Sequence, residues 1–289
     1  MSLISSSYGF IPWFTIFVLK IAKEAGDMIL VDDSFGTIVR GVQEGRCIYE
    51  NIQAFIKFLI SSNIGEVIAV FLTTISGLPN ILTAIQLLWV NLITDGPPAI
   101  ALGWNPPDDT VMKKSPRDRE ASIVNSWTIT RYFLIGTYIG LSTVGIFVTY
   151  FLDNEIPIDL LSRWTECTDL ASDMSICDAF SHDAMEVPQT LALTTLVTTE
   201  MLNALSSVSL DTSLLKTGLQ RNPRLLLSVI ISLAMHVGIM YSGRLGVPAI
   251  AHSFGLVPLS IEQWESVLLW SMPILAVDES LKLYSRRNK

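Results

Sequence analysis

The stretch WVNLITDGPP, residues 89–98, lies inside one of the most apolar parts of the chain. It follows ILTAIQLL and precedes AIALGW, yet it contains Asn91, Thr94 and Asp95, followed by a Gly-Pro-Pro sequence. A buried charge without a partner is unfavourable, and two consecutive prolines interrupt a helix. Either this segment is not a helix, or another group compensates for its polar side chains.

Composition predicts a helical membrane protein. Half of the 289 residues are hydrophobic and only 16% are charged, whereas soluble domains carry about a quarter charged residues. Runs close to the ~20 residues that cross a bilayer recur along the chain. We predict an all-α membrane protein, a six-transmembrane helical bundle with a short cytosolic stalk. Its spans lie near residues 53–74, 81–101, 130–151, 187–206, 225–242 and 264–284.

Acidic residues lower the hydropathy of two of these spans. Glu200 interrupts the fourth, and Asp278 and Glu279 interrupt the sixth, so neither stands out by hydropathy alone. In the loop 153–186 many acidic residues gather, which predicts a solvated lumenal loop, or alternatively a weak exit vestibule that attracts cations.

Basic residues are distributed unevenly, and this predicts the orientation of the chain. They cluster in 104–127, 207–224 and the C-terminal end, whereas the alternate loops contain only Arg163 and Arg244. The positive-inside rule therefore places the N-terminal segment and those three segments in the cytosol. The net charge of −8 argues against a nucleic-acid partner, so the expected partner is the lipid bilayer.

Three predicted spans each carry a carboxylate near mid-membrane, where ionisable groups are costly and by default mark a functional pathway. Neighbouring amide and hydroxyl side chains follow at helical spacing, on the same helix face as the acid. Hard oxygen ligands without a Cys or Met cluster suit Ca²⁺ rather than a soft metal. The predicted metal ligands are Asn63, Glu66, Asn91, Thr94, Asp95 and Glu200.

Interhelical hydrogen bonds that only hold a bundle together are the alternative for these polar groups. They would explain a single Asn or Thr, but three carboxylates at similar depth repel one another unless a cation or protons neutralise them. Because three acids exceed the charge of one divalent ion, Glu200 is expected to carry a proton. The prolines after Asp95 free carbonyl groups, which are tolerated at this depth where they line a cavity.

The first fifty residues differ from the rest. Residues 1–20 are atypical, with an apolar run too short to span a membrane. Residues 28–31 predict a short strand, and a cytosolic helix is expected to begin near Ser34 and run into the first span. The turn SGLPN, residues 76–80, predicts a hairpin of the first two spans.

Several motifs resemble the ion-binding helices of sarco/endoplasmic-reticulum-type calcium-transporting P-type ATPases. They are ISSNIGEV (60–67), QLLWVNLITDGPPAIALGWNPPD (86–108) and VTTEMLNAL (197–205). The stretch 28–39 is similar to the exit from that family's phosphorylation domain into its stalk. The resemblance runs from about Ile21 to the C-terminus. It implies that 21–50 is the end of the phosphorylation domain and the stalk helix, and that 51–289 is the C-terminal transmembrane domain, the last six of ten spans.

The resemblance also implies specific roles. Asn63, Glu66, Thr94, Asp95 and Glu200 match the family's first calcium site, and Asn91 and Asp95 match part of its second. Ca²⁺ is then the transported ion, and the combination of Glu66, Thr94 and Glu200 favours the two-site endoplasmic-reticulum type and that membrane. Cys167 and Cys177 lie in the lumenal loop, where an oxidising environment allows a disulfide, and resemble a lumenal pair of the family.

Other motifs of the family are absent from the sequence, among them DKTG, TGE and GDGxND. ATP and Mg²⁺ are therefore expected to bind only to a full-length pump, and this chain alone should have no ATPase activity. We predict the membrane part of an ATP-driven calcium pump, a truncated or fragmentary chain that partners the missing N-terminal part. The alternative is a non-catalytic remnant that associates with or modulates a full-length pump.

One small-residue pattern predicts helix packing. Gly136 and Gly140 form a G-x-x-x-G motif in the third span, and Gly65 in the first span offers a facing small residue. Small residues let membrane helices approach closely, so these two helices are expected to pack together.

Overall fold

The computed structural model describes residues 20–21, 23–25, 34–107, 111–113, 115–116, 123–162, 164, 180–210 and 212–287. Every regular element in these ranges is a helix, which confirms the all-α class for this part of the chain. The chain divides into two compact units, residues 1–46 and 47–289. The strand expected at 28–31 and nearly all of the atypical N-terminal segment lie outside the described residues.

Six helices of more than ten residues make up most of the described chain. They are α2 (Phe35–Ile75), α5 (Ser126–Asp153), α8 (His182–Ser206), α10 (Pro223–Met240), α12 (Ile261–Ser271) and α13 (Pro273–Arg287). Shorter α-helical pieces connect or extend them: α3 (Ala84–Trp89), α4 (Gly96–Leu102), α6 (Ile158–Leu161), α9 (Leu214–Thr217) and α11 (Pro248–Phe254). A π-helical turn, η1, covers Val90–Thr94, and 3₁₀ turns cover Val111–Lys113 (η2) and Leu219–Arg221 (η5).

α2 confirms the continuous helix predicted from about Ser34. Its buried positions in the second unit recur every three or four residues, as at Ala54, Phe58, Gly65 and Ala69. This spacing places them on one face of the helix, which packs into the bundle. Together with α5 and α10, α2 is one of three described helices that are long and apolar enough to cross a membrane.

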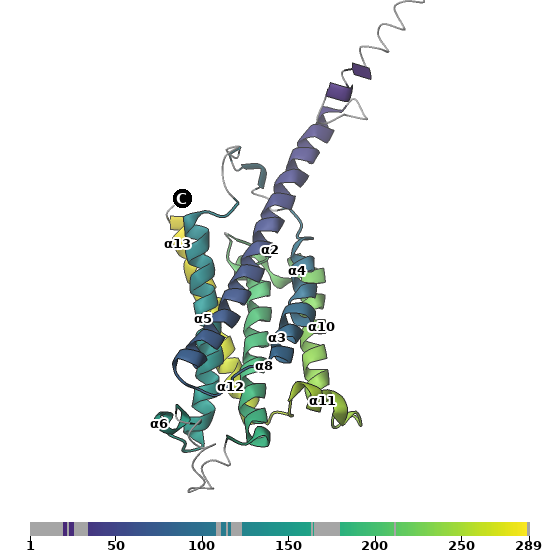
Figure 1. The fold of residues 1–289 in the computed structure, drawn as a ribbon. Coiled ribbons are helices and arrows are strands. Elements are labelled where there is room, and N and C mark those ends of the chain that lie inside the picture. Colours follow the sequence, from purple (N-terminus) through teal and green to yellow (C-terminus); the bar gives the residue numbers. More distant parts are fainter. Residues whose placement is uncertain are drawn as a thin grey trace, which may run out of the picture. The chain divides into compact units, whose positions relative to one another are not determined.

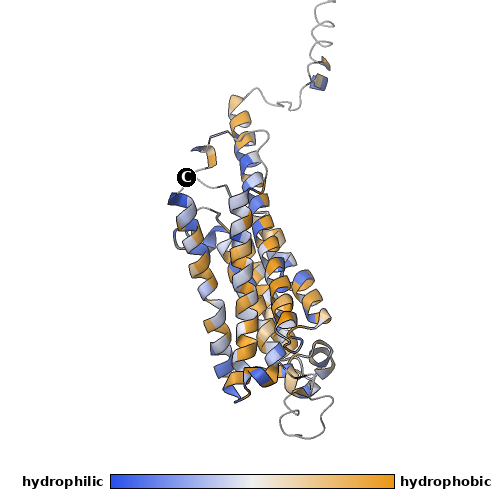
Figure 2. Cartoon of the chain, turned by 60° about the vertical axis from the view of Figure 1, so that its left-hand side comes forward, coloured by the Kyte–Doolittle hydropathy of each residue, from blue (hydrophilic) through white to orange (hydrophobic). Residues whose placement is uncertain are grey.

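α8 forms the centre of the second unit. It contacts α4, α5, α10, α12 and α13 (Figure 1), and its middle from Leu191 to Val197 is entirely buried. The surrounding helices turn large apolar side chains outward, among them Val67, Phe71, Phe133, Leu227 and Leu269. Figure 2 shows hydrophobic residues along the lengths of these helices. An apolar outer surface on helical elements of this length is what a lipid environment requires.

The predicted glycine contact between α2 and α5 is confirmed. A Cβ placed on Gly136 would lie 2.6 Å from Cγ2 of Ile64 and 2.8 Å from the carbonyl oxygen of Ser61. A Cβ on Gly65 would lie 2.6 Å from Cγ2 of Ile139. These separations leave no room for a methyl group, so the two backbones approach each other because glycine stands at the crossing.

Two of the six predicted spans are not continuous helices. Residues 81–101 form α3, η1 and α4 in succession, because Pro97 and Pro98 carry no amide hydrogen for the preceding turn. Residues 264–284 divide into α12 and α13 at Met272, since Pro273 removes the next helical donor. All three prolines sit in the first turn of the helix that follows, where proline is tolerated.

Candidate functional site

The stretch 89–98 is a helix interrupted by a π turn. The amide of Asp95 donates to the carbonyl of Val90, five residues earlier, at 3.0 Å. The Thr94 hydroxyl donates to the same carbonyl at 2.8 Å. π turns of this kind are frequent at functional sites, because the wider turn displaces backbone and side chains from the regular helical register. Thr94 and Asp95 are buried here, whereas Asn91 is exposed, so the three side chains do not share one environment.

Glu66 and Asn91 link α2 to this turn. The Asn91 amide donates to both carboxyl oxygens of Glu66, at 2.9 Å and 2.6 Å, and also to the carbonyl of Leu87. Glu66 is buried on the inner face of α2. A side-chain amide that reaches a carboxylate on another helix satisfies both groups within the membrane region. The predicted meeting of the first two spans therefore rests on a specific polar contact.

Asp95 and Glu200 form the innermost part of the site. Both are fully enclosed, with Asp95 1% and Glu200 0% exposed. Their carboxyl groups lie close enough to interact directly, and Glu66 lies within electrostatic range of both. Among the described residues, no group outside this pair donates a hydrogen bond to the four carboxyl oxygens of Asp95 and Glu200, and a hydrogen bond between the two acids requires that one of them carries a proton. Buried acceptors of this kind are costly without a partner, so this is a position that a cation or a proton would stabilise.

Asn63 is placed differently from the other predicted ligands. Its side chain is exposed, and its amide donates to the carbonyl of Leu59 in its own helix at 2.7 Å. Asn63 lies three residues before Glu66, yet only Glu66 faces the interior, because the edge of the buried face of α2 runs between the two residues. In the described ranges there is also no group of three or more His, Cys, Asp or Glu side chains in the geometry of a metal site. Glu66, Asp95 and Glu200 therefore do not form a complete set of metal ligands in this structure.

A second polar cluster, which we call the Asp278 cluster, was missed from the sequence. The Asp278 carboxylate contacts Lys57 Nζ at 2.9 Å, Arg131 Nη2 at 2.7 Å and Lys282 Nζ at 3.0 Å. It also accepts a hydrogen bond from Ser206. Asp278 and the two lysines are 0% exposed, and the cluster joins α2, α5, α8 and α13. The signal that could have revealed it is the charge complementarity of Lys57 and Arg131 with Asp278, all within predicted spans.

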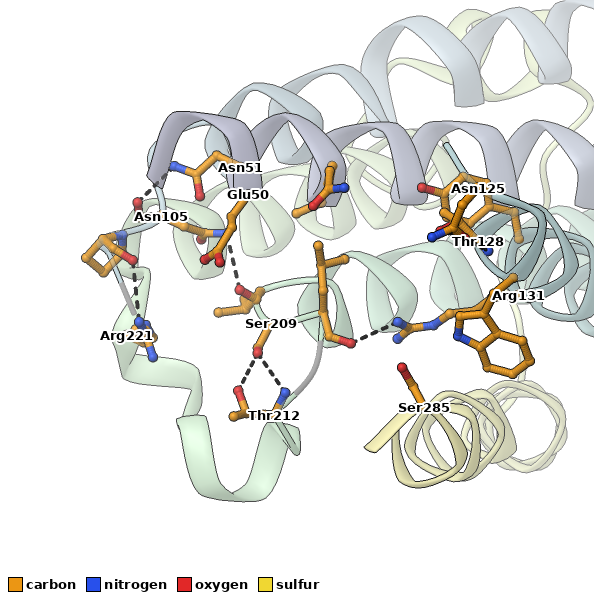
Figure 3. Close-up of a pocket in the computed structure, with 17 residues that line it drawn as sticks. Glu50, Asn51, Asn105, Asn125, Thr128, Arg131, Ser209, Thr212, Arg221 and Ser285 are labelled. Atoms are coloured by element: carbon orange, nitrogen blue, oxygen red, sulfur yellow. Dashed lines mark hydrogen bonds between the residues drawn. The ribbon is translucent and has the colours of Figure 1, made fainter. Parts of the chain in front are cut away.

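Arg131 of this cluster also lines a polar cavity of about 250 Å³ (Figure 3). Several of its lining groups bond to one another: Arg131 donates to the carbonyl of Leu210, Asn51 to that of Asn105, and Arg221 to that of Pro106. The lining includes the start of the first predicted span and the loops 104–127 and 207–224, together with Ser285 near the C-terminal end. The segments predicted to share one side of the membrane therefore lie at one end of the bundle.

The cysteine pair is untested by this geometry. Cys167 and Cys177 lie outside the described residues, and the disulfide stays a prediction.

Comparison with known proteins agrees with the resemblance in the sequence. Residues 79–284 match the family described as cation transporting ATPase, C-terminus. The chain is 43% identical over 298 aligned residues to an endoplasmic-reticulum-type calcium-transporting ATPase 2 of Arabidopsis thaliana, covering 92% of this chain and 28% of that protein. It is 45% identical over 284 residues to a calcium-transporting ATPase of Plasmodium falciparum, covering 93% and 23%.

A third relative is the endoplasmic reticulum calcium ATPase srcA of Aspergillus fumigatus, 43% identical over 271 residues, covering 92% of this chain and 27% of that protein. The chain thus spans about a quarter of the length of the curated relatives that it matches. The family match covers most of the chain, including α8 and the buried acids Asp95, Glu200 and Asp278. The chain therefore belongs to the cation-transporting ATPases and corresponds to the C-terminal transmembrane part of the endoplasmic-reticulum-type calcium pumps among them.

Proposed function

We propose that this chain is the cation-binding membrane part of an ATP-driven calcium pump of the endoplasmic reticulum. It crosses the bilayer six times, with α3, η1 and α4 forming the second crossing and α12 and α13 the sixth. The end of the bundle that carries the polar cavity lined by Arg131 faces the cytosol, since the basic loops lie at that end. ATP and Mg²⁺ act elsewhere in a full-length pump, not on this chain.

One observation supports the proposal: the buried carboxyl groups of Glu66, Asp95 and Glu200, which come from three helical segments, lie within electrostatic range of one another. An ionisable group inside a membrane is retained where it serves a pathway or a ligand. Carboxyl oxygens together with amide and hydroxyl oxygens are hard ligands of the kind that Ca²⁺ takes, six to eight at a time. A soft metal would need sulfur ligands instead.

The ligands we assign are Asn63, Glu66, Asn91, Thr94, Asp95 and Glu200. Asp95 is the central one, because it interacts with both other acids and directly follows the π turn. Asn63 faces away from these acids in this structure, so its participation requires the exposed part of α2 to turn inward. Three carboxylates carry one negative charge more than a divalent cation balances, and we assign the compensating proton to Glu200.

Calcium binding to the purified chain in lipid nanodiscs tests this assignment. Equilibrium binding of ⁴⁵Ca²⁺ should be weak, with Kd on the order of 0.1–1 mM, the range of the weak calcium sites of extracellular modules. Asp95→Asn should weaken binding by about tenfold or more, since calcium affinity follows the number of ligand charges. Glu262→Gln, which neutralises an exposed acid in the first turn of α12, is the matched control and should leave binding unchanged.

Competition with Mg²⁺ sharpens the result. Mg²⁺ loses its water reluctantly and demands octahedral geometry, so a site built from these ligands should prefer Ca²⁺. Equal loss of binding in Asp95→Asn and Glu262→Gln would show that calcium associates with surface acids, and the assignment would be wrong. Low-micromolar affinity in the wild-type chain would contradict the expectation that this part of a pump binds Ca²⁺ only weakly on its own.

A further inference from the structure

α10 carries no acid in the proposed calcium site, yet it touches the π turn directly. It packs against both η1 and α4 (Figure 1). At the contact, the Ser232 hydroxyl donates to the carbonyl oxygen of Thr94 at 3.0 Å. Ser232 and Thr94 are both 0% exposed. The contact therefore joins α10 to the residue that immediately precedes Asp95.

The Thr94 carbonyl needs this donor because of the sequence that follows it. In an α-helix its partner would be the amide of the residue four positions later, which is Pro98 and has no hydrogen. In a π-helix the partner would be the amide of the residue five positions later, Ala99. That amide lies in α4 and donates to the carbonyl of Asp95 instead. A buried carbonyl without a donor is costly in a membrane. A hydroxyl from another helix meets this need.

A serine in a helix can instead donate its hydroxyl to a carbonyl one turn earlier in the same helix, so a bond to another helix is a specific contact. Ser228, one turn earlier on α10, donates to the carbonyl of Leu225 in its own helix at 2.8 Å. Serine hydroxyls commonly bond three or four residues back in this way. Ser232 reaches across to Thr94 instead, so the two serines occupy the same helix with different roles.

We propose that Ser232 is a positioning residue of the calcium site: by holding the Thr94 carbonyl it sets the π turn and thereby the place of Thr94 and Asp95. This inference rests on the proposed function and extends it to α10. Ser232 touches no ion itself. It acts through the backbone of the turn, where Pro98 cannot donate to the Thr94 carbonyl and the Ala99 amide donates to the carbonyl of Asp95.

Three variants in nanodiscs test the proposal by ⁴⁵Ca²⁺ binding. Ser232→Ala should lower the calcium affinity about three- to twentyfold, the factor that interhelical hydrogen bonds in membrane proteins are worth. Ser232→Thr keeps a hydroxyl and should restore the affinity. Ser228→Ala removes the neighbouring hydroxyl and should leave the affinity as in the wild type. Ser232→Ala with the affinity of Ser228→Ala, or Ser232→Thr as weak as Ser232→Ala, would overturn the proposal.

Amide hydrogen exchange of residues 90–102 gives a second readout that needs no calcium. Ser232→Ala should speed exchange in this stretch by a similar factor, and Ser228→Ala should not. The two proposals then fail separately. If Asp95→Asn weakens calcium binding while Ser232→Ala changes neither readout, only the positioning role is wrong. If Asp95→Asn has no effect while Ser232→Ala speeds exchange, the calcium assignment is wrong and the structural contact stands.

Discussion

Neutralising Asp278 is expected to destabilise the bundle more than neutralising the acid next to it. Asp278→Asn keeps the shape of the side chain but leaves Lys57, Arg131 and Lys282 without their shared counter-charge. All three cations contact the carboxylate within 3.0 Å, and Asp278 is 0% exposed. The cluster joins four helices, so removal of the Asp278 charge should lower the stability of the whole bundle rather than loosen a single loop.

The magnitude follows from these distances. At an effective dielectric constant of about 20, unit charges roughly 3 Å apart attract by roughly 5–6 kcal/mol each. Desolvation of the buried groups offsets most of that attraction, and removal of one partner from a buried ion pair costs about 3–5 kcal/mol. We expect Asp278→Asn to lower the free energy of unfolding by about 3–5 kcal/mol, a large share of the about 5–15 kcal/mol that stabilises a typical protein.

Glu279→Gln is the matched control. Glu279 is adjacent on α13, its side chain is 24% exposed, and its carboxylate lies 3.7 Å from Lys282 Nζ. Its Oε1 accepts a hydrogen bond from the Leu214 amide at 2.7 Å, which the amide oxygen of glutamine can also accept. Only a partly exposed charge is lost, so the expected cost is at most about 1 kcal/mol.

Unfolding in mixed micelles with increasing SDS, followed by tryptophan fluorescence and by helical circular dichroism, measures both variants. Coincident transitions in the two signals justify a two-state free energy. Lys57→Met in the Asp278→Asn background should recover part of the loss, because it removes one uncompensated cation, whereas Lys57→Met alone should destabilise. Equal stability of Asp278→Asn and Glu279→Gln would refute the reasoning, since it would mean that the three buried cations need no counter-charge.

Two further predictions concern helix packing. Gly136→Ala should destabilise the bundle by about 1–3 kcal/mol, because the new Cβ would lie 2.6 Å from Ile64. The control Gly238→Ala, whose Cβ would have nothing within 4 Å, should be neutral or stabilising by up to about 1 kcal/mol. Equal losses of stability in the same SDS titration would contradict the close approach of α2 and α5. Asn222→Ala removes the N-cap of α10 and the donor to the Ala101 carbonyl, and should lower the free energy of unfolding by about 1–3 kcal/mol. An unchanged free energy of unfolding would show that these hydrogen bonds contribute nothing.

Sequence alone determined the class of the protein and the chemistry of its interior. Long apolar runs, basic loops on alternate sides and three acids inside the runs are properties of neighbouring residues, and lipid constrains them strongly. The continuous helix from near Ser34 and the contact of Gly65 with α5 were readable for the same reason. The break at Pro273 was missed in the predicted span 264–284, although the sequence carries its signal, since proline acts through its own missing donor.

Tertiary structure decided which polar groups meet. Lys57 and Asp278 are 221 residues apart in the chain, and no local pattern states that they share one cluster. Asn63 and Glu66 are three residues apart, yet only Glu66 is buried, because the packing of neighbouring helices sets where the buried stripe of α2 ends. Helical spacing gives the relative direction of two side chains but not the rotation of the helix against its neighbours. That rotation depends on contacts between distant segments, and it alone decides which side chains face the interior of the bundle.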